Sequence, residues 1–173
     1  MSEHVSPHVG ILMGSDSDWP KIKAVAAALD QFGVAYEAQV MSAHRTPEAV
    51  RQYAASAAGR GLKVIIAAAG GAAHLAGMVA SHTTLPVIGV PVPTDLSGGL
   101  DSLLSIVQMP GDVPVATVGV GGGGPRNAGL LAVQILALSN VGLQDKLAAF
   151  KHKLVEKVGE KDEKLQKTLC SEK

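Results

Sequence analysis

Cysteine, aromatic residues and net charge are all scarce in this chain of 173 residues. Its single cysteine, Cys170, excludes an internal disulfide and is typical of a protein from a reducing compartment. Aromatic residues make up 3% of the chain although 47% of it is hydrophobic, so the core must consist mainly of Ala, Val, Leu and Ile. Lys and Arg number 15, as do Asp and Glu, which leaves no basic surplus for binding nucleic acid or an anionic membrane.

Long hydrophobic runs and metal-ligand patterns are missing as well. No run of about 18 apolar residues is present to span a bilayer, and residues 1–7 lack the apolar segment of a signal peptide. No group of His, Cys, Asp and Glu has the spacing of a metal site, so we expect no metal. The sequence therefore predicts a cytoplasmic protein, with neither nucleic acid nor a membrane among its partners.

What the sequence does contain is a regular alternation of short apolar runs with segments of helical periodicity. The expected strands span residues 9–13, 34–40, 62–67, 85–90 and 113–120. The expected helices run from about 19 to Gly33, from 47 to about 59, from just after His74 through 79, and over 100–107 and 127–138. Strands that alternate with helices predict an α/β fold, a parallel sheet with helices on both faces in three layers.

We expect residues 1–173 to form a single domain, because the length suits one core and no repeat divides the chain. Within it we predict a flexible N-terminus over 1–8, an α/β core over 9–142, and a C-terminal helix and charged tail over 143–173. Apolar residues recur every three or four positions in the tail, at Leu143, Leu147, Phe150, Leu154 and Val158. Such a stripe must be buried against the same domain or another subunit, and we expect the end beyond Gly159 to fray.

A loop rich in serine and histidine follows the second expected strand. Ser42, His44 and Arg45 lie there, just before a helix start at Thr46-Pro47-Glu48. Open α/β sheets bind ligands at the carboxyl ends of their strands. Arginine can hold a phosphate through its planar fork, serine adds a hydroxyl, and histidine can exchange a proton near neutral pH. These residues are therefore candidates for a catalytic site.

Three further loops are rich in small residues. Gly14-Ser15-Asp16-Ser17-Asp18 suits a phosphate or ribose site, and equally an ordinary capping turn. Gly70-Gly71-Ala72-Ala73-His74 offers backbone amides to a flat ring or a small carboxylate, or else allows a strand and a helix to pack closely. Gly121-Gly122-Gly123-Gly124 lacks the lysine and hydroxyl of a phosphate-binding loop, so we interpret it as a flexible connection.

Four segments together resemble the PurE family, namely Met13–Trp19, Ser42–Pro47, Gly70–Leu75 and Asp101–Pro110. The resemblance implies a flavodoxin-like (Rossmann-type) doubly wound sheet and a homo-octamer. It also implies an isomerase of purine (IMP) biosynthesis, N5-carboxyaminoimidazole ribonucleotide mutase. This class I enzyme moves a carboxylate from an exocyclic nitrogen to ring carbon 4, without metal, ATP or organic cofactor. Class II members instead carboxylate aminoimidazole ribonucleotide with CO2 and carry lysine at the position of Arg45, so Arg45 favours class I.

The same resemblance implies a role for each matching residue. Ser15, Ser42 and Arg45 would hold the 5′-phosphate of a small-molecule ribonucleotide substrate, and Asp18 its ribose hydroxyls. His44 would be the proton shuttle and His74 would help to position the substrate, which makes these two the expected catalytic residues. The backbone of Gly70, Gly71 and Ala72 would confine the CO2.

Three alternatives remain at this point. The nearest is a class II carboxylase that uses free CO2 on the same scaffold. A flavodoxin-like module that binds FMN or another nucleotide would need aromatic side chains to stack on a flavin, and this chain has few of them. A non-enzymatic assembly protein would explain the small-residue surfaces and the tail, but it leaves the Ser42–Arg45 loop without a purpose.

Overall fold

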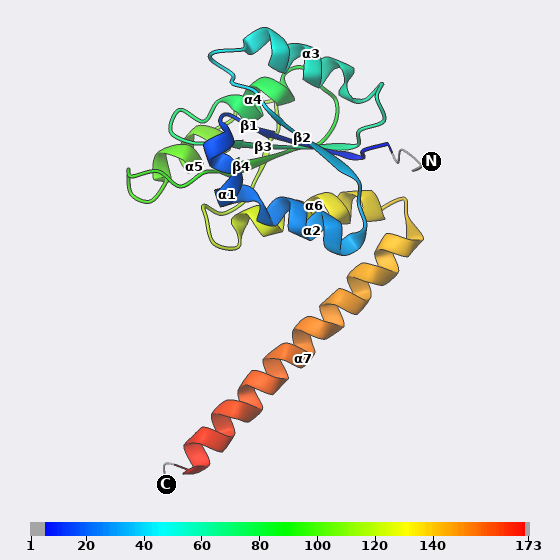
Figure 1. Cartoon of the computed structure of the whole chain (residues 1–173), viewed down its shortest axis with the longest axis vertical. Coiled ribbons are helices and arrows are strands. Elements are labelled where there is room, and N and C mark those ends of the chain that lie inside the picture. Colours follow the sequence, from blue (N-terminus) through cyan, green and yellow to red (C-terminus); the bar gives the residue numbers. More distant parts are fainter. Residues whose placement is uncertain (1–5, 172–173) are drawn as a thin grey trace. The chain divides into compact units, whose positions relative to one another are not determined.

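A computed structural model of the chain describes residues 6–171. Residue contacts divide the chain into two compact units, Met1–Ile135 and Leu136–Lys173. The first unit contains a five-stranded sheet in the order β2-β1-β3-β4-β5, and every neighbouring pair is parallel (Figure 1). The strands are β1 Val9–Met13, β2 Tyr36–Val40, β3 Val64–Ala69, β4 Val87–Pro91 and β5 Ala116–Thr117. This strand order is that of flavodoxin-like doubly wound sheets, and it confirms the predicted fold class.

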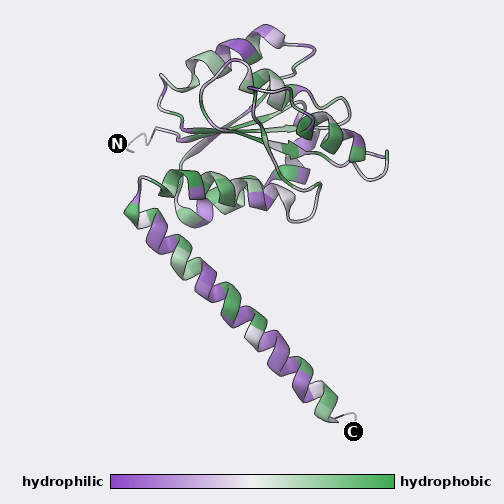
Figure 2. Ribbon diagram, turned by 180° about the vertical axis from the view of Figure 1, so that it is seen from behind, coloured by the Kyte–Doolittle hydropathy of each residue, from purple (hydrophilic) through white to green (hydrophobic). Residues whose placement is uncertain are grey.

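Helices cover both faces of the sheet (Figure 1). One face carries α3 (Pro47–Ala57), α4 (Leu75–Ala80) and α5 (Leu100–Val107). The other carries α1 (Trp19–Ile22), α2 (Ala24–Phe32) and α6 (Gly124–Ala137), and a 3₁₀ turn, η1 (Asp16–Asp18), precedes α1. Strands β1, β3 and β4 are buried along their whole length, as strands covered on both sides must be. In Figure 2 the strands of the sheet are largely hydrophobic.

Local sequence signals explain where several helices begin and end. Gly33 has a left-handed φ of 71° and closes α2 by donating its N–H to the carbonyls of Asp30 and Leu29. Pro47 occupies the first turn of α3, where its missing N–H costs nothing, and Glu48 lies beside it at the positive end of the helix dipole. These elements therefore form where the sequence predicts them.

Two elements differ from the prediction in length or continuity, and in addition α6 begins at Gly124, inside the segment interpreted as a connection, and not at residue 127. Strand β5 has only two residues, although a strand was expected over 113–120, and it lies at the sheet edge, paired with β4 alone. The helix expected from residue 19 to Gly33 is divided at Lys23, which caps the end of α1 and the start of α2. None of these differences moves the loops that follow β1, β2 and β3.

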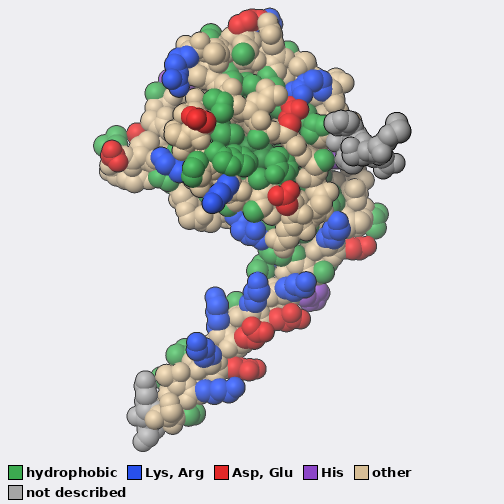
Figure 3. Space-filling view, in the orientation of Figure 1, with side chains coloured by type: hydrophobic (Ala, Val, Ile, Leu, Met, Phe, Trp, Pro, Cys, Tyr) green, Lys and Arg blue, Asp and Glu red, His purple; other side chains and the backbone are tan. Residues whose placement is uncertain are grey.

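The second unit contains one long helix, α7 (Val141–Ser171). It continues past Gly159, where we expected fraying. Glu160 and Lys164, like Glu163 and Lys167, are four residues apart in the order that favours a helix. Side chains of both charges cover α7 in Figure 3, with hydrophobic residues between them.

The predicted flexible segment 1–8 lies mostly outside the described residues, which begin at residue 6. Within that described part, the N–H of His8 donates to the carbonyl of Ala35 at 2.9 Å, so residue 8 already joins the sheet region. Among the helices of residues 6–171, none combines the length and the apolar character needed to cross a membrane.

The register of the central strands determines where the loops begin. Met13, the last residue of β1, is opposite Val40 on β2 and Ala68 on β3. The pairing continues one step further, because the N–H of Met41 donates to the carbonyl of Met13 at 2.9 Å. Three polar loops therefore leave the same edge of the sheet at the same level.

Candidate active site

The three loops enclose a pocket at the carboxyl ends of β1, β2 and β3. It contains about 600 Å³ of space, including the space at its open mouth. All of the predicted site residues except Gly71 line it, and the lining is Gly14, Ser15, Asp18, Ser42, Ala43, His44, Arg45, Ala69, Gly70, Ala72, His74 and Leu75.

The loop after β2 is held by its own hydroxyl groups. Ser42 Oγ accepts the N–H groups of His44 at 3.3 Å and Arg45 at 3.2 Å. Thr46 stands at the N-cap position of α3, but its hydroxyl does not cap the helix. Thr46 Oγ1 instead accepts the N–H of Ser42 at 2.9 Å and donates to the Ser42 carbonyl at 3.2 Å. The loop is thus closed on itself, and the acceptor side of Ser42 Oγ is occupied while its O–H stays able to donate.

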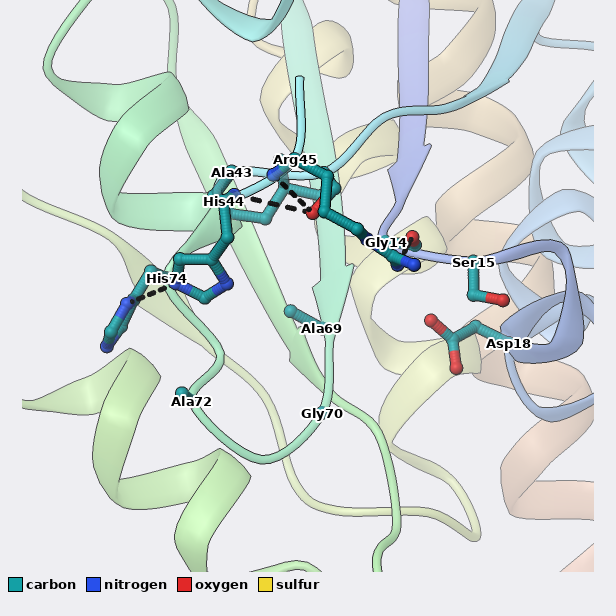
Figure 4. A pocket seen from close by; sticks show the side chains of 12 residues that line it. Gly14, Ser15, Asp18, Ala43, His44, Arg45, Ala69, Gly70, Ala72 and His74 are labelled. Atoms are coloured by element: carbon teal, nitrogen blue, oxygen red, sulfur yellow. Dashed lines mark hydrogen bonds between the residues drawn. The ribbon is translucent and has the colours of Figure 1, made fainter. Parts of the chain in front are cut away.

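Arg45 connects this loop to the one after β1. Its Nη2 donates to the carbonyl of Gly14 at 3.2 Å, and the side chain lies along the rim of the pocket (Figure 4). Guanidinium has five N–H donors in a planar fork, so one bond to a carbonyl leaves donors for an anion. Arg45 therefore presents a fixed positive charge at the mouth, held by both loops.

Two histidines contact each other at one side of the pocket. His44 Nε2 and His74 Nδ1 are 2.8 Å apart, and the rings meet edge to face, with 4.9 Å between their centroids. Such a bond requires one of the two nitrogens to be unprotonated. Figure 4 shows that the other ring nitrogen of His44, Nδ1, points toward the open pocket. His74 therefore orients the His44 ring and leaves one of its nitrogens free to exchange a proton with a ligand.

Ser15 and Asp18 lie on the opposite side of the pocket from the histidines (Figure 4). Ser15 Oγ accepts the N–H of Ser17 at 3.3 Å and caps the η1 turn. Burial raises the pKa of Asp18, an effect that the positive charge of Lys21 opposes. Lys21 is itself held by a bond from Nζ to the carbonyl of Pro93 at 3.3 Å. The partly buried carboxylate of Asp18, beside the hydroxyl of Ser15, is suited to accept hydrogen bonds from sugar hydroxyls.

The loop after β3 forms the remaining wall. Gly70 and Ala72 line the pocket, whereas the peptide between them turns toward α5. The N–H of Gly71 donates to Ser102 Oγ at 2.9 Å, and φ of Gly71 is +65°, in the left-handed region. Neither this turn nor the role of Ser102 was predicted from the sequence. The one sequence signal for this anchor is a pair of serines, Ser102 and Ser105, spaced three apart in a helix whose other residues are apolar except Asp101.

The pocket combines a cation, a paired histidine, hydroxyls, a carboxylate and a wall of small residues. Within the described residues, no group of three or more His, Cys, Asp or Glu side chains is placed to hold a metal ion. The charged and polar groups suit a phosphorylated sugar derivative, and His44 suits proton transfer to it.

Comparison with known proteins agrees with this chemistry. Residues 8–157 match the model of the family described as AIR carboxylase. A Mycobacterium tuberculosis protein named N5-carboxyaminoimidazole ribonucleotide mutase is 60% identical over 161 residues, which cover 93% of this chain and 91% of that one. A Vibrio cholerae protein of the same name is 57% identical over 150 residues, 87% and 93% of the two chains. The crystal structure of Treponema denticola PurE matches with a TM-score of 0.82 at 33% identity, over 92% of this chain and 98% of that one.

The position of Arg45 predicts that it dominates the binding of inorganic phosphate. We expect Arg45→Ala to lower phosphate affinity by roughly 10- to 100-fold, the value of one charge-assisted hydrogen bond. Titration calorimetry would measure it. Arg51→Ala is the matched control, because it removes the same charge from an exposed ion pair with Glu48 in α3. Equal losses in the two variants would mean that general electrostatics, and not the Arg45 contact, holds the anion.

Proposed function

The chain belongs to the AIR carboxylase (PurE) family, and we propose that it is a class I member. Its activity is the conversion of N5-carboxyaminoimidazole ribonucleotide to 4-carboxy-5-aminoimidazole ribonucleotide in purine biosynthesis. Identities of 60% and 57% to proteins that carry the mutase name favour this over a carboxylase that uses free CO2. The single observation that carries the function is the combination of this identity with His44 and Arg45 in one pocket.

The substrate would lie with its phosphate on Ser15, Ser42 and Arg45 and with its ribose on Asp18. These groups line the same pocket, and Arg45 already bridges the loops after β1 and β2. A 5′-phosphate at this end would direct the imidazole ring toward His44 and toward the Gly70 and Ala72 wall. We therefore propose that Ser15, Ser42 and Arg45 bind the phosphate and that Asp18 binds the ribose.

His44 would act first as an acid and then as a base. The cationic ring donates a proton from Nδ1 to the exocyclic nitrogen, while the bond from that nitrogen to the carboxylate carbon breaks. Its electron pair stays on nitrogen, and CO2 departs. Ring carbon 4 then attacks the CO2 with the enamine electron pair and forms the new carbon–carbon bond. Neutral His44 removes the proton from carbon 4, which restores the aromatic ring and the starting state of the histidine.

His74 would support this shuttle without contacting the migrating group. Its Nδ1 lies 2.8 Å from His44 Nε2. When His74 Nδ1 accepts, the Nε2 proton of His44 stays in place, and the proton that moves is the one on Nδ1. His44 can therefore serve as both acid and base, because donating the proton leaves the neutral ring that the second step needs, and accepting one restores the cationic ring that the first step needs.

We also propose that the chain acts in the cytoplasm as one functional domain assembled into a homo-octamer. Leu100, Leu104 and Val107 lie four and three residues apart on α5, and they are 46%, 48% and 48% exposed. Hydrophobic side chains also gather on the face of the protein drawn in Figure 3. Apolar area of this kind is characteristic of surfaces that subunits cover.

The shuttle predicts that His44→Asn abolishes turnover and leaves substrate binding intact. Asparagine keeps a polar side chain but cannot exchange the proton, so kcat should fall by about 10²- to 10⁴-fold. Steady-state kinetics and the dissociation constant of the substrate would be measured together. His82→Asn, at a histidine on a different hollow beside Ser81, is the control. A His44→Asn variant with near-normal kcat would refute the shuttle, and one that no longer binds would make His44 a binding residue.

The assembly predicts a mass near eight times the 17.6 kDa of one chain. Leu104→Glu should reduce it, because a carboxylate in a buried apolar contact is costly. Multi-angle light scattering would measure both proteins. Thr84→Glu is the control, since it adds the same charge at an exposed polar position in the loop between α4 and β4, outside α5. A monomeric wild-type chain would contradict the octamer, and an unchanged Leu104→Glu octamer would exclude this face of α5 from the interface.

A further inference from the structure

Among residues 6–171, the one polar side chain that is fully buried is not in the pocket. It is Ser102, which lies on the inner side of α5 with an exposed fraction of 0%. A buried hydroxyl is costly unless its hydrogen bonds are made. Ser102 Oγ donates to the carbonyl of Val92 at 2.8 Å and accepts the N–H of Gly71 at 2.9 Å. The Ser102 hydroxyl thus makes both a donor and an acceptor bond to backbone groups, and one of these groups, the Gly71 N–H, lies between two residues of the pocket lining.

A second serine of α5 holds the other end of the same residue. Ser105 Oγ donates to the carbonyl of Gly71 at 3.1 Å. Gly71 is therefore bound on both sides, through its N–H by Ser102 and through its C=O by Ser105. Since φ of Gly71 is +65°, where other residues are strained, this anchored conformation depends on glycine.

The anchored peptide lies between the two residues that form the pocket wall. Gly70 and Ala72 line the pocket on either side of Gly71. The residue just before the wall, Ala69, is fixed as well, because its carbonyl accepts the N–H of Val92 at 2.9 Å. Ser102 thus closes a ring of contacts that runs from the end of β3 through Val92 and back to Gly71.

The start of α5 is fixed in turn by an aspartate. Asp101 Oδ1 accepts the Thr94 hydroxyl at 2.6 Å and the N–H of Ser102 at 2.8 Å. The Thr94 bond lowers the pKa of Asp101, so this carboxylate stays ionised to a lower pH than usual. A Cβ added to Gly70 would meet Thr94 at 3.4 Å and Val92 at 3.5 Å, so the wall already lies against these residues.

We propose that Ser102 and Ser105 are positioning residues that set the shape of the CO2-retaining wall. This inference rests on the proposed function, in which CO2 is free between the two steps. A neutral molecule without strong hydrogen bonds is retained by the fit of the walls and not by charge. A loop that loses an anchor opens the wall, and CO2 then escapes before carbon 4 can attack it. The two serines would therefore govern the coupling of the steps and not substrate affinity.

Retention of label tests this directly. Substrate labelled in the migrating carboxylate is converted by the full chain in excess unlabelled bicarbonate, and the label remaining in the product is measured. Ser105→Ala should increase the fraction of turnovers that lose label by roughly twofold to tenfold, the equilibrium value of one hydrogen bond. KM should stay near that of the wild type, because the phosphate contacts are untouched. Ser102→Ala should act in the same direction and also lower Tm.

Two controls separate positioning from general loss of structure. Ser105→Thr keeps the hydroxyl and should restore label retention. Ser56→Ala removes a serine that donates to a carbonyl within α3, and it should leave retention unchanged. A variant that is merely destabilised loses rate without changing the fraction of label retained.

The outcomes separate this inference from the proposed function. A wild-type chain that converts the substrate, together with unchanged label retention in Ser105→Ala, would overturn this inference alone. A wild-type chain that converts no substrate would overturn both. Hydrogen exchange at the Gly71 amide gives a readout that needs no activity. We expect faster exchange in Ser102→Ala, and protection equal to the wild type would exclude the anchor.

Discussion

The parallel pairing of β1 with both β2 and β3 determines the position of every loop in the site. Met13 is in register with Val40 and Ala68, so the three strands end within one residue of each other. Parallel strands present their carboxyl ends at one edge, and three loops from distant parts of the sequence must meet there. Strands β1 and β3 are apolar and buried throughout, so the centre of the scaffold that carries these loops is rigid.

Each loop is then fixed by hydrogen bonds of its own, and this preorganisation explains how a small site works without a cofactor in the proposed mechanism. Ser42 and Thr46 close the loop that carries His44, and His74 holds the His44 ring. Ser102, on α5, accepts the N–H of Gly71 and so anchors the loop after β3. Groups held in this way need little reorganisation when charge moves, which is where electrostatic and proton-transfer catalysis gain most.

The sequence was sufficient for the features that depend on one residue and its neighbours. Apolar runs predicted β1 and β3, Gly33 predicted the end of α2, and Pro47 the start of α3. Long-range contacts were beyond it. Thr46 has the position of a cap, yet its hydroxyl bonds to Ser42, because the tight loop places that partner nearer. Gly71 was expected to face the substrate, but its N–H bonds to Ser102, 31 residues away.

An assay of the purified wild-type chain, without ATP or added metal, tests the central claim most directly. N5-carboxyaminoimidazole ribonucleotide is supplied in one reaction, and aminoimidazole ribonucleotide with bicarbonate in the other. The structure and the identities to named mutases predict rapid conversion of the first substrate and poor use of the second. Efficient use of the second alone would contradict the class I assignment and with it the significance given to Arg45.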